Sequence, residues 1–455
     1  MRQTLEVNKL LVFYEDHLKR VLLPFWLRST DWEDGGYLNC YDNTGARLVS
    51  TDKYTWSQGR FVWMYAKLAS MDAGTFDDQE RRQFLDLAGH GASFLMRHCL
   101  LENGSCVFVM DKKGRPKLIP PHNRYDSSIF ADCFVIAGLS KYAAVSGDHA
   151  SLDFARMLYR SVMKRILSGN YQMAPYPTPE GHKSHNIPMI LLHVTQELLE
   201  AEELLSESNP AALRENMKRL MEEITEHFID DDDVLNEMIG TDNRRIDSLL
   251  GRYCNPGHSI EDMWFIIHAA RKLNMEKYIA QAVRTAKTMF DLGWDEKYGG
   301  LFLFVDRDGG KPRGTKTGIE HTSMVRQIEQ NWDNKVWWVH SEALYTMLLC
   351  YSITRNEQWL SDYWKIHDYT FRTFPNPDER IGEWIQIRMR NGQPDNKVVA
   401  LPVKDPYHII RNVCLIIELL NGMKKDQQAG ECNEHSEGDV GSYSTSKHSQ
   451  DQTTL

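Results

Sequence analysis

The most constraining feature of this sequence is an alternation of amphipathic helical segments with short, turn-rich segments, which continues from the N-terminus to about residue 423. The helical segments place apolar residues three and four positions apart, so each would bury one face. A unit that repeats in this way buries its apolar face against neighbouring copies. The pattern therefore predicts an array of paired helices, with clear examples at 8–26, 57–71, 188–205 and 408–423.

The turn-rich segments carry a repeat of their own, which begins at Asp31, Glu102, Trp294 and Glu379. Each has a turn, often with paired glycines, then a short alternating aromatic run and a second turn. Alternation over so few residues is typical of a small β-hairpin. We expect an all-α toroid of about a dozen helices, with the hairpins in the loops at the end that holds a deep pocket. An open helical solenoid is the alternative, because periodicity cannot show that a ring closes.

The length of the chain fits one large domain followed by a tail. A closed barrel can use several hundred residues around a single core, so we assign residues 1–423 to one barrel domain. Residues 424–455 lose the apolar period and are rich in Ser, Gly, Glu and Gln. This last segment is predicted to be a disordered polar tail.

Charge and composition argue against several classes of protein. A formal net charge of -10 without a stripe of Lys and Arg argues against a nucleic-acid partner. No stretch approaches the roughly 18 apolar residues of a membrane span, and the N-terminus lacks a signal-peptide pattern. The eight cysteines are scattered without a CxxC pair, which is typical of reduced thiols. We expect a cytoplasmic protein that binds no membrane, with a homodimer as the commonest assembly.

The first candidate for chemistry is the segment Asn-Pro-Gly-His-Ser-Ile-Glu from Asn255. Pro256 and Gly257 break the preceding chain, so we expect a helix to begin near His258, with Glu261 on the same face of its first turn. The positive end of a helix favours a neutral, proton-accepting imidazole, which Glu261 would orient. The simpler alternative is that His258 caps the helix and Glu261 complements its dipole.

A second segment, Lys-Asp-Pro-Tyr-His from Lys404, has the same arrangement. Asp405 and Pro406 bring the chain to a helix start, which would leave His408 at the mouth of the helix. Two histidines at the pocket ends of helices suit proton transfer at a sugar C2, with one base on each face of the carbon and pKa values near neutral. Taken alone, a histidine in the position of His408 has a structural role more often than a catalytic one.

Two further helical segments carry polar groups among aromatic ones. Trp56 and Arg60 lie four positions apart, which makes Arg60 either a surface residue or a buried cation that stabilises developing negative charge. The other segment contains Trp338, His340 and Glu342. Positions two apart do not share a helix face, so His340 and Glu342 cannot both point into a pocket unless the helix begins between them.

Two other signals lack the spacing of the sites they suggest. His182, His185 and His193 have neither the i, i+4 pattern nor the Cys partner of a zinc site. The glycine-rich segment from Gly309 lacks the GxxxxGKS/T spacing of a phosphate-binding loop. We therefore expect neither a metal nor a cofactor.

Taken together, the motifs resemble the N-acylglucosamine 2-epimerase superfamily, which also includes aldose-ketose isomerases and cellobiose 2-epimerases. The resemblance runs from roughly residue 8 to 420 and is closest to the N-acylglucosamine branch. The segments that carry it, in family order, are GGY at Gly35, KYTWSQGRFVWMY at Lys53, SIFADCF at Ser128, IPMILL at Ile187, NPGHSIEDMWFI at Asn255, WDEKYGGLFLF at Trp294, KVWWVHSEAL at Lys335, GEW at Gly382 and KDPYHIIR at Lys404.

The resemblance implies an (α/α)6 barrel and a metal-free, non-redox reaction at C2 of a sugar. His258 and His408 match the histidines that act as general base and acid, and Arg60 matches the cation that faces the enediolate oxygens. Glu261 and Glu342 match carboxylates that bind substrate and tune the histidines. The resemblance further implies substrate contacts from Trp56, Asn186, Trp338, His340, Tyr407 and Arg411.

Two departures from the family pattern bear on the substrate. Asn186 stands where acyl-amino sugar epimerases have Ala, and KDPYH replaces KGCFH; the Asn resembles enzymes of unacylated sugars. We expect interconversion of N-acyl-D-glucosamine and N-acyl-D-mannosamine. The alternative is an epimerase or aldose-ketose isomerase of unacylated sugars such as mannose, glucose, fructose or a disaccharide. A glycoside hydrolase with paired carboxylates and a non-catalytic binding protein are the remaining interpretations.

Overall fold

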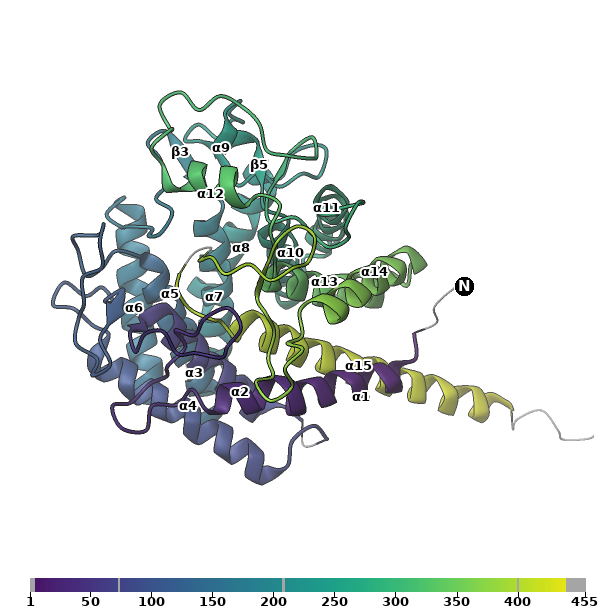
Figure 1. The fold of residues 1–455 in the computed structure, drawn as a ribbon. Helices are drawn as coiled ribbons and strands as arrows, with labels where there is room; N and C mark the ends of the chain where they lie inside the picture. The colour runs from purple at the N-terminus through teal and green to yellow at the C-terminus, as the bar shows by residue number, and fades with distance from the viewer. Residues whose placement is uncertain (1–4, 73, 207–208, 399–400, 439–455) are drawn as a thin grey trace, which may run out of the picture.

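The helices pair along the chain, and each pair contributes one inner and one outer helix (Figure 1). The computed structural model describes residues 5–438 apart from 73, 207–208 and 399–400, with side chains described to residue 428. The inner helices are α3 (Thr55–Ser70), α5 (Ile129–Ser146), α7 (Asn186–Leu205), α10 (Pro256–Leu273), α13 (Trp337–Thr354) and α15 (Tyr407–Gly438). The outer helices are α1 (Val7–Asp16), α4 (Asp78–His98), α6 (His149–Leu167), α8 (Ala211–Glu223), α11 (Glu276–Gly293) and α14 (Glu357–Thr373).

The inner helices form a closed ring. Each contacts the next along the chain, and the last of them, α15, contacts the first, α3. Outer helix α1 lies beside α15, so the two ends of the barrel sequence meet (Figure 1). The predicted (α/α)6 barrel is therefore confirmed, and the open solenoid is excluded because its first and last units would not touch. Short additional helices are η1 (His17–Leu22), α2 (Leu23–Leu27), η2 (Ile224–Phe228), α9 (Leu249–Arg252) and α12 (Ser323–Asn331).

Local sequence explains where the helices begin. The side chain of Asp77 accepts from the backbone of Glu80, and the side chain of Glu80 accepts from the backbone N–H of Asp77, which makes a capping box at α4. At α10, Asn255 caps the first turn and Pro256 occupies the first helical position, where the missing N–H costs nothing. These caps place the predicted start of the His258 helix correctly.

The close packing of α3 on α5 depends on two glycines. A Cβ at Gly59 would collide with the backbone of Phe134, and a Cβ at Gly138 would collide with the carbonyl of Gly59. Glycine lets the two backbones touch. This contact brings the first turns of α3 and α5 together at the same end of the barrel.

The predicted hairpins are present in minimal form, and the named strands add pairings between different loops. Each named strand pairs with one from a different loop: β1 (Lys53–Tyr54) with β2 (Val109–Met110), β3 (His182–Ser184) with β4 (Met238–Gly240), β5 (Tyr253–Cys254) with β6 (Val305–Asp306), and β7 (Lys335–Val336) with β8 (Ile387–Arg388). All four pairings are antiparallel. The predicted hairpins are reduced to single bridges, such as Thr30 to Tyr37 and Trp294 to Leu301. The segments are too short to form ladders of their own, and they instead link neighbouring loops around the rim.

One helix is long and apolar enough to cross a membrane by length and composition alone. It is α5 (Ile129–Ser146), and 72% of its window is buried inside the barrel. It packs between α3 and α7, which is the place of a core helix. The seven cysteines with described side chains are all free and buried, while Cys432 lies outside that part of the chain.

The predicted domain boundary at residue 423 is not a structural boundary. Helix α15 continues to Gly438, because the sequence after Met423 contains helix-forming Lys, Gln, Ala and Glu and no proline. The backbone from 424 to 438 is therefore helical rather than disordered. The rest of the predicted tail, 439–455, lies outside the described residues.

Candidate active site

A cavity of about 240 Å³ lies at the N-terminal ends of all six inner helices. Its volume is below the roughly 300–1,000 Å³ of pockets for drug-sized ligands, so it suits a small molecule. The helices contribute residues from their N-terminal halves, namely Trp56 and Arg60, Phe130 and Phe134, Asn186, Met189, Ile190 and His193, His258, Glu261 and Phe265, Trp337 and Trp338, and His408 and Arg411.

The position of this cavity gives it a built-in electrostatic preference. The N-terminus of a helix carries a partial positive charge because its first N–H groups have no helical partner. Six such ends surround the cavity. The site is therefore suited to an anion or to a reaction in which negative charge develops.

His258 is bonded to a carboxylate that the sequence did not indicate. Its Nδ1 lies 3.3 Å from both carboxylate oxygens of Glu237 and 3.1 Å from Nδ2 of Asn255. Burial alone would lower the pKa of His258, but Glu237, Glu261 and Asp262 raise it above the usual value. These carboxylates therefore act against the neutral form of the imidazole that the helix end was expected to favour.

His408 has an equivalent partner on the neighbouring helix. Its Nδ1 lies 2.7 Å from Oε1 of Glu342, and Arg411 donates to the same oxygen at 2.6 Å. Burial tends to raise the pKa of Glu342, yet Arg411 and His408 lower it to about 2. Glu342 is therefore a fixed anion that orients His408.

The two candidate histidines face the same aromatic ring. The centroid of Trp338 lies 5.1 Å from that of His258 and 5.5 Å from that of His408. Both imidazoles line the cavity. In the described part of the chain neither Nε2 forms a hydrogen bond, since both rings use Nδ1 for their carboxylates. Each histidine therefore has a free nitrogen available to a bound ligand.

Arg60 is a buried cation held between aromatic rings. It donates to Asp405, and its guanidinium lies 4.0 Å from the ring centroid of Phe134 and 4.9 Å from that of Trp56. Tyr407 packs against it from the far side at 5.1 Å. The structure supports the predicted buried cation and rejects the surface alternative, because Arg60 is only 8% exposed.

Arg411 joins two of the predicted carboxylates. Its Nη2 donates to both Glu261 and Glu342. With His408, these carboxylates form the one cluster in the described residues that has metal-ligand spacing. A metal ion there would compete with the guanidinium for the same carboxylate oxygens. The geometry therefore favours Arg411 as the cation of this cluster.

Three of the predicted site residues do not line the cavity. Glu342 and Tyr407 lie behind it, where Glu342 supports His408 and the hydroxyl of Tyr407 bonds Nε2 of His193 at 2.7 Å. The third residue is His340, for which the predicted substrate contact is wrong. Its Nδ1 bonds the carbonyl of Val336 and its Nε2 accepts from the N–H of Leu301, so both nitrogens are used inside the fold.

The remaining predicted residues lie where a ligand could touch them. Trp56, Asn186 and Trp338 all line the cavity, and the Asn186 amide lies 3.2 Å from the hydroxyl of Ser184. The helix containing His340 begins at Trp337, before both His340 and Glu342. These two side chains accordingly leave the helix in different directions, as their spacing required.

Sequence reasoning missed Glu237 and His193. Glu237 sits in an irregular loop before β4, where no spacing relates it to His258. His193 was considered only as part of a histidine cluster, yet it lines the cavity through the second turn of α7. Burial lowers the pKa of His193 well below its usual value, so it is a neutral hydrogen-bonding group. The signal that could have found it is its place seven residues after Asn186 on one helix face.

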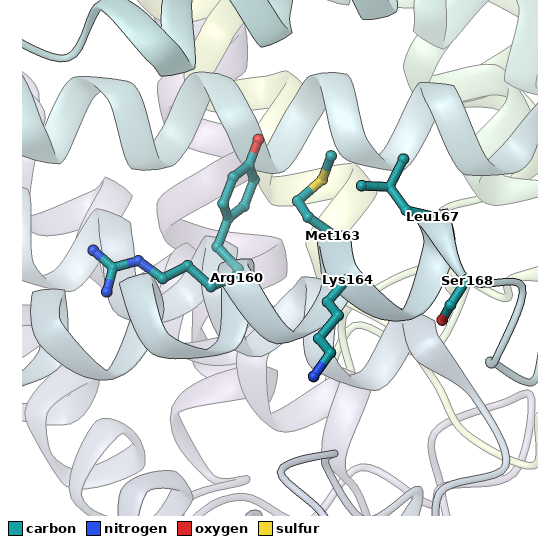
Figure 2. Close-up of a pocket in the computed structure, with 6 residues that line it drawn as sticks. Arg160, Met163, Lys164, Leu167 and Ser168 are labelled. Carbon is teal, nitrogen blue, oxygen red and sulfur yellow. The ribbon is translucent and has the colours of Figure 1, made fainter.

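A second hollow lies along the outer helix α6 (Figure 2). Figure 2 shows Met163 and Leu167 on one side of this helix and Lys164 on the other. All its lining residues come from 159–168. A single helix face presents no opposed chemical groups, so the candidate active site is the barrel cavity.

The fold and the site define an (α/α)6-barrel enzyme with two imidazoles lining a cavity at the N-terminal ends of its inner helices. The chain belongs to the N-acylglucosamine 2-epimerase (GlcNAc 2-epimerase) family, which it matches over residues 36–412.

Individual relatives agree along most of the chain. The N-acylglucosamine 2-epimerase of Homo sapiens is 30% identical over 433 residues, covering 93% of this chain and 92% of the relative. That of Bos taurus is 29% identical over 422 residues, covering 90% and 92%. The solved cellobiose 2-epimerase of Bacillus thermoamylovorans B4167 has a TM-score of 0.71 at 21% identity, covering 90% of this chain and 99% of that one. This last likeness concerns the fold.

Proposed function

We propose that this protein is a sugar 2-epimerase that interconverts N-acyl-D-glucosamine and N-acyl-D-mannosamine. The observation that carries the proposal is the pair of imidazoles, His258 and His408, that line one cavity and face one indole. Each ring is held at Nδ1 by a carboxylate, which leaves Nε2 for proton transfer. Inversion at a carbon requires such a pair, because the proton leaves one face and another returns to the opposite face.

The proposed reaction begins with the open-chain sugar. A neutral imidazole takes the C2 proton and becomes an imidazolium, while the electron pair of the C–H bond forms the C1–C2 double bond of an enolate and the C1 carbonyl oxygen takes the negative charge. The second histidine, already an imidazolium, then donates its proton to the other face of C2. The product is the C2 epimer, and the two histidines have exchanged protonation states.

The enolate needs strong stabilisation because C2–H is a far weaker acid than imidazolium. Arg60 lines the cavity as a buried cation, and six helix N-termini add partial positive charge. Preorganised donors of this kind each contribute about 3 kcal/mol to comparable anionic transition states. We propose Arg60 as the group that faces the C1 enolate oxygen.

The apolar part of the cavity supports an acylated substrate. Met173, Met189, Met238 and Met324 all contribute to the lining. Methionine side chains adapt to irregular apolar groups such as an acyl methyl. Asn186 is the polar exception on α7, and its amide would instead suit a hydroxyl group. Epimerisation or aldose-ketose isomerisation of unacylated sugars is therefore the alternative to be tested.

A glycoside hydrolase receives no support from the carboxylates. That chemistry places two carboxyl groups on opposite sides of the scissile bond. The two carboxylates that line the cavity, Glu261 and Asp405, are each paired with an arginine, Arg411 and Arg60. Neither is free to act as a nucleophile or an acid.

The predictions about assembly and location stand as proposals beside this one. We propose a cytoplasmic enzyme that assembles as a homodimer. Its partner is a small sugar, and it binds neither nucleic acid nor membrane. We also propose that the reaction uses no metal, because Arg411 already occupies the candidate ligand cluster.

One experiment separates these functions. The purified protein is incubated in heavy water with N-acetylglucosamine, N-acetylmannosamine, glucose, mannose and cellobiose, and C2 exchange is followed by NMR. The proposal expects deuterium at C2 and the epimeric product with the N-acyl sugars. Exchange with unacylated sugars alone would support the alternative, and no exchange with any sugar would refute the epimerase.

A further inference from the structure

A chain of alternating carboxylates and imidazoles leads from His258 into the protein core. Behind the His258–Glu237 contact, Nδ1 of His185 lies 3.9 Å from Oε1 of Glu237. On its other side, Nε2 of His185 lies 2.8 Å from Oδ2 of Asp262. Glu237, His185 and Asp262 are each no more than 1% exposed. The cavity histidine is thus the outermost member of a buried network of four titratable groups.

Within the described residues, this network contains no lysine or arginine. The ion pairs of Glu237 and Asp262 involve only His185 and His258. A buried carboxylate without a compensating positive charge is strongly unfavourable. The network must therefore hold protons of its own, and His258 is its one member that lines the cavity.

His408 lies in a different electrostatic environment. Its partner Glu342 also accepts a hydrogen bond from Arg411. The guanidinium offsets part of the negative charge of Glu342. The two histidines have similar partners at Nδ1, but only the partner of His408 is shared with a permanent cation.

Among the residues that the structure describes, the other elements around His258 add no lysine or arginine in contact with its ring. Trp338 of α13 packs against the ring without carrying charge. Helix α10 itself contributes two further carboxylates, Glu261 and Asp262, that raise the pKa of His258. The charged groups of α15, His408 and Arg411, contact Glu261. The titratable and charged groups that face His258 are Glu237 and His185 from the β3–β4 side, Glu261 and Asp262 from α10, and Arg411 and His408 from α15.

We propose that Glu237, supported by His185 and Asp262, is a positioning residue that keeps the transferable proton of the resting enzyme on His258. His258 therefore begins the reaction as the acid and His408 begins it as the base. The sugar epimer that the resting enzyme accepts is the one whose C2–H faces His408. This inference rests on the proposed two-histidine epimerase.

The test is the substitution Glu237→Gln in the full-length protein, which keeps the shape of the side chain and removes its charge. The titration of His258 is followed by NMR with ¹³C-labelled histidine, and its resonance is assigned by its absence in His258→Gln. The proposal expects the pKa of His258 to fall by about 1 unit or more, because a contacting opposite charge is lost. In the pH profile of kcat/KM, the apparent pKa of the alkaline limb should fall by a similar number of pH units.

A matched control and a rescue variant distinguish this role from a structural one. Asp242 is an exposed carboxylate in the turn after β4, and Asp242→Asn should leave the His258 titration unchanged. Glu237→Asp keeps the charge, so it should restore part of the raised pKa. A fold defect would affect Glu237→Asp and Glu237→Gln alike and would not give the smaller fall in the pKa of His258 that is expected for Glu237→Asp.

The outcomes are separable from those of the proposed function. If Glu237→Gln does not fold, Asp262→Asn replaces it, with a smaller fall in the pKa of His258 expected. An unchanged His258 titration in a folded variant overturns the inference while wild-type C2 exchange still supports the epimerase. Absence of C2 exchange in the wild type overturns both, and the titration, which needs no substrate, then reports only the electrostatics of the network.

Discussion

The Nδ1 atom of His408 lies 2.7 Å from Oε1 of Glu342, although the two residues are separated by 66 positions in the chain. The contact joins α15 to its neighbour α13 in the inner ring. It holds the imidazole in one orientation with Nε2 unbonded, and it makes the His408 site dependent on the packing of these two helices. His258 is held in the same way by Glu237, from a loop rather than from a helix.

Replacing either histidine should remove the reaction without removing the fold. We expect His258→Gln and His408→Gln each to lower kcat by about 10²–10⁴-fold, because each loses one general acid–base group. C2 deuterium exchange measured by NMR checks the effect, and circular dichroism checks the fold. Full activity in either variant would rule out the two-base scheme.

Arg60→Lys should be a severe substitution despite keeping the charge. Lysine lacks the planar guanidinium that contacts the Phe134 and Trp56 rings and donates to Asp405, so it would not reproduce these contacts. We expect kcat to fall by about 10²-fold or more. The control is Arg20→Lys on an exposed helix face, which should behave as wild type. Equal steady-state kinetics for the two variants would contradict the role of Arg60.

Glu342→Gln should change the acid stability of the protein. The folded pKa of Glu342 is about 2, below its ordinary value of 4.5, so its ionised form stabilises the fold above about pH 4.5. That stabilisation is lost as the pH falls toward 2. The variant should be less stable near neutral pH by about 3 kcal/mol, because Arg411 and His408 lose a buried partner.

Differential scanning calorimetry across this pH range gives the comparison. The Tm of the wild type should fall more steeply between pH 4.5 and 2 than that of Glu342→Gln. Parallel acid slopes in the two proteins would show that Glu342 is not the group responsible.

His340→Ala should affect stability rather than substrate binding. The substitution leaves the buried N–H of Leu301 without its acceptor, at a cost of about 1–3 kcal/mol. The Tm should fall while KM stays unchanged. A raised KM at constant Tm would indicate that His340 contacts the substrate.

Asn186→Ala tests the choice between acylated and unacylated sugars. The amide lines the cavity, and its loss would remove a partner for a sugar hydroxyl. We expect kcat/KM for mannose to fall relative to that for N-acetylmannosamine, by about 10-fold for one lost hydrogen bond of 1.4 kcal/mol. Parallel losses on both sugars would mean that Asn186 does not discriminate between them.

The sequence by itself determined the class of fold and the two helix starts that carry the histidines. Helical period, caps such as Asn255 and breaks such as Pro256 act over a few residues, so they can be recognised without knowing the rest of the chain. The same local patterns placed Arg60 on the aromatic face of its helix. They also indicated hairpins, but such short segments could not show that the strands would pair between loops.

Only the tertiary structure decided which groups meet inside the cavity. Arg411 and Glu261 are 150 positions apart, and their ion pair exists because α10 and α15 converge on the barrel axis. Glu237 reaches His258 from an irregular loop, and His340 turns away to bond Leu301. Such contacts depend on the closing of the ring and on the direction of each side chain, and neither is encoded in the spacing of residues along one helix.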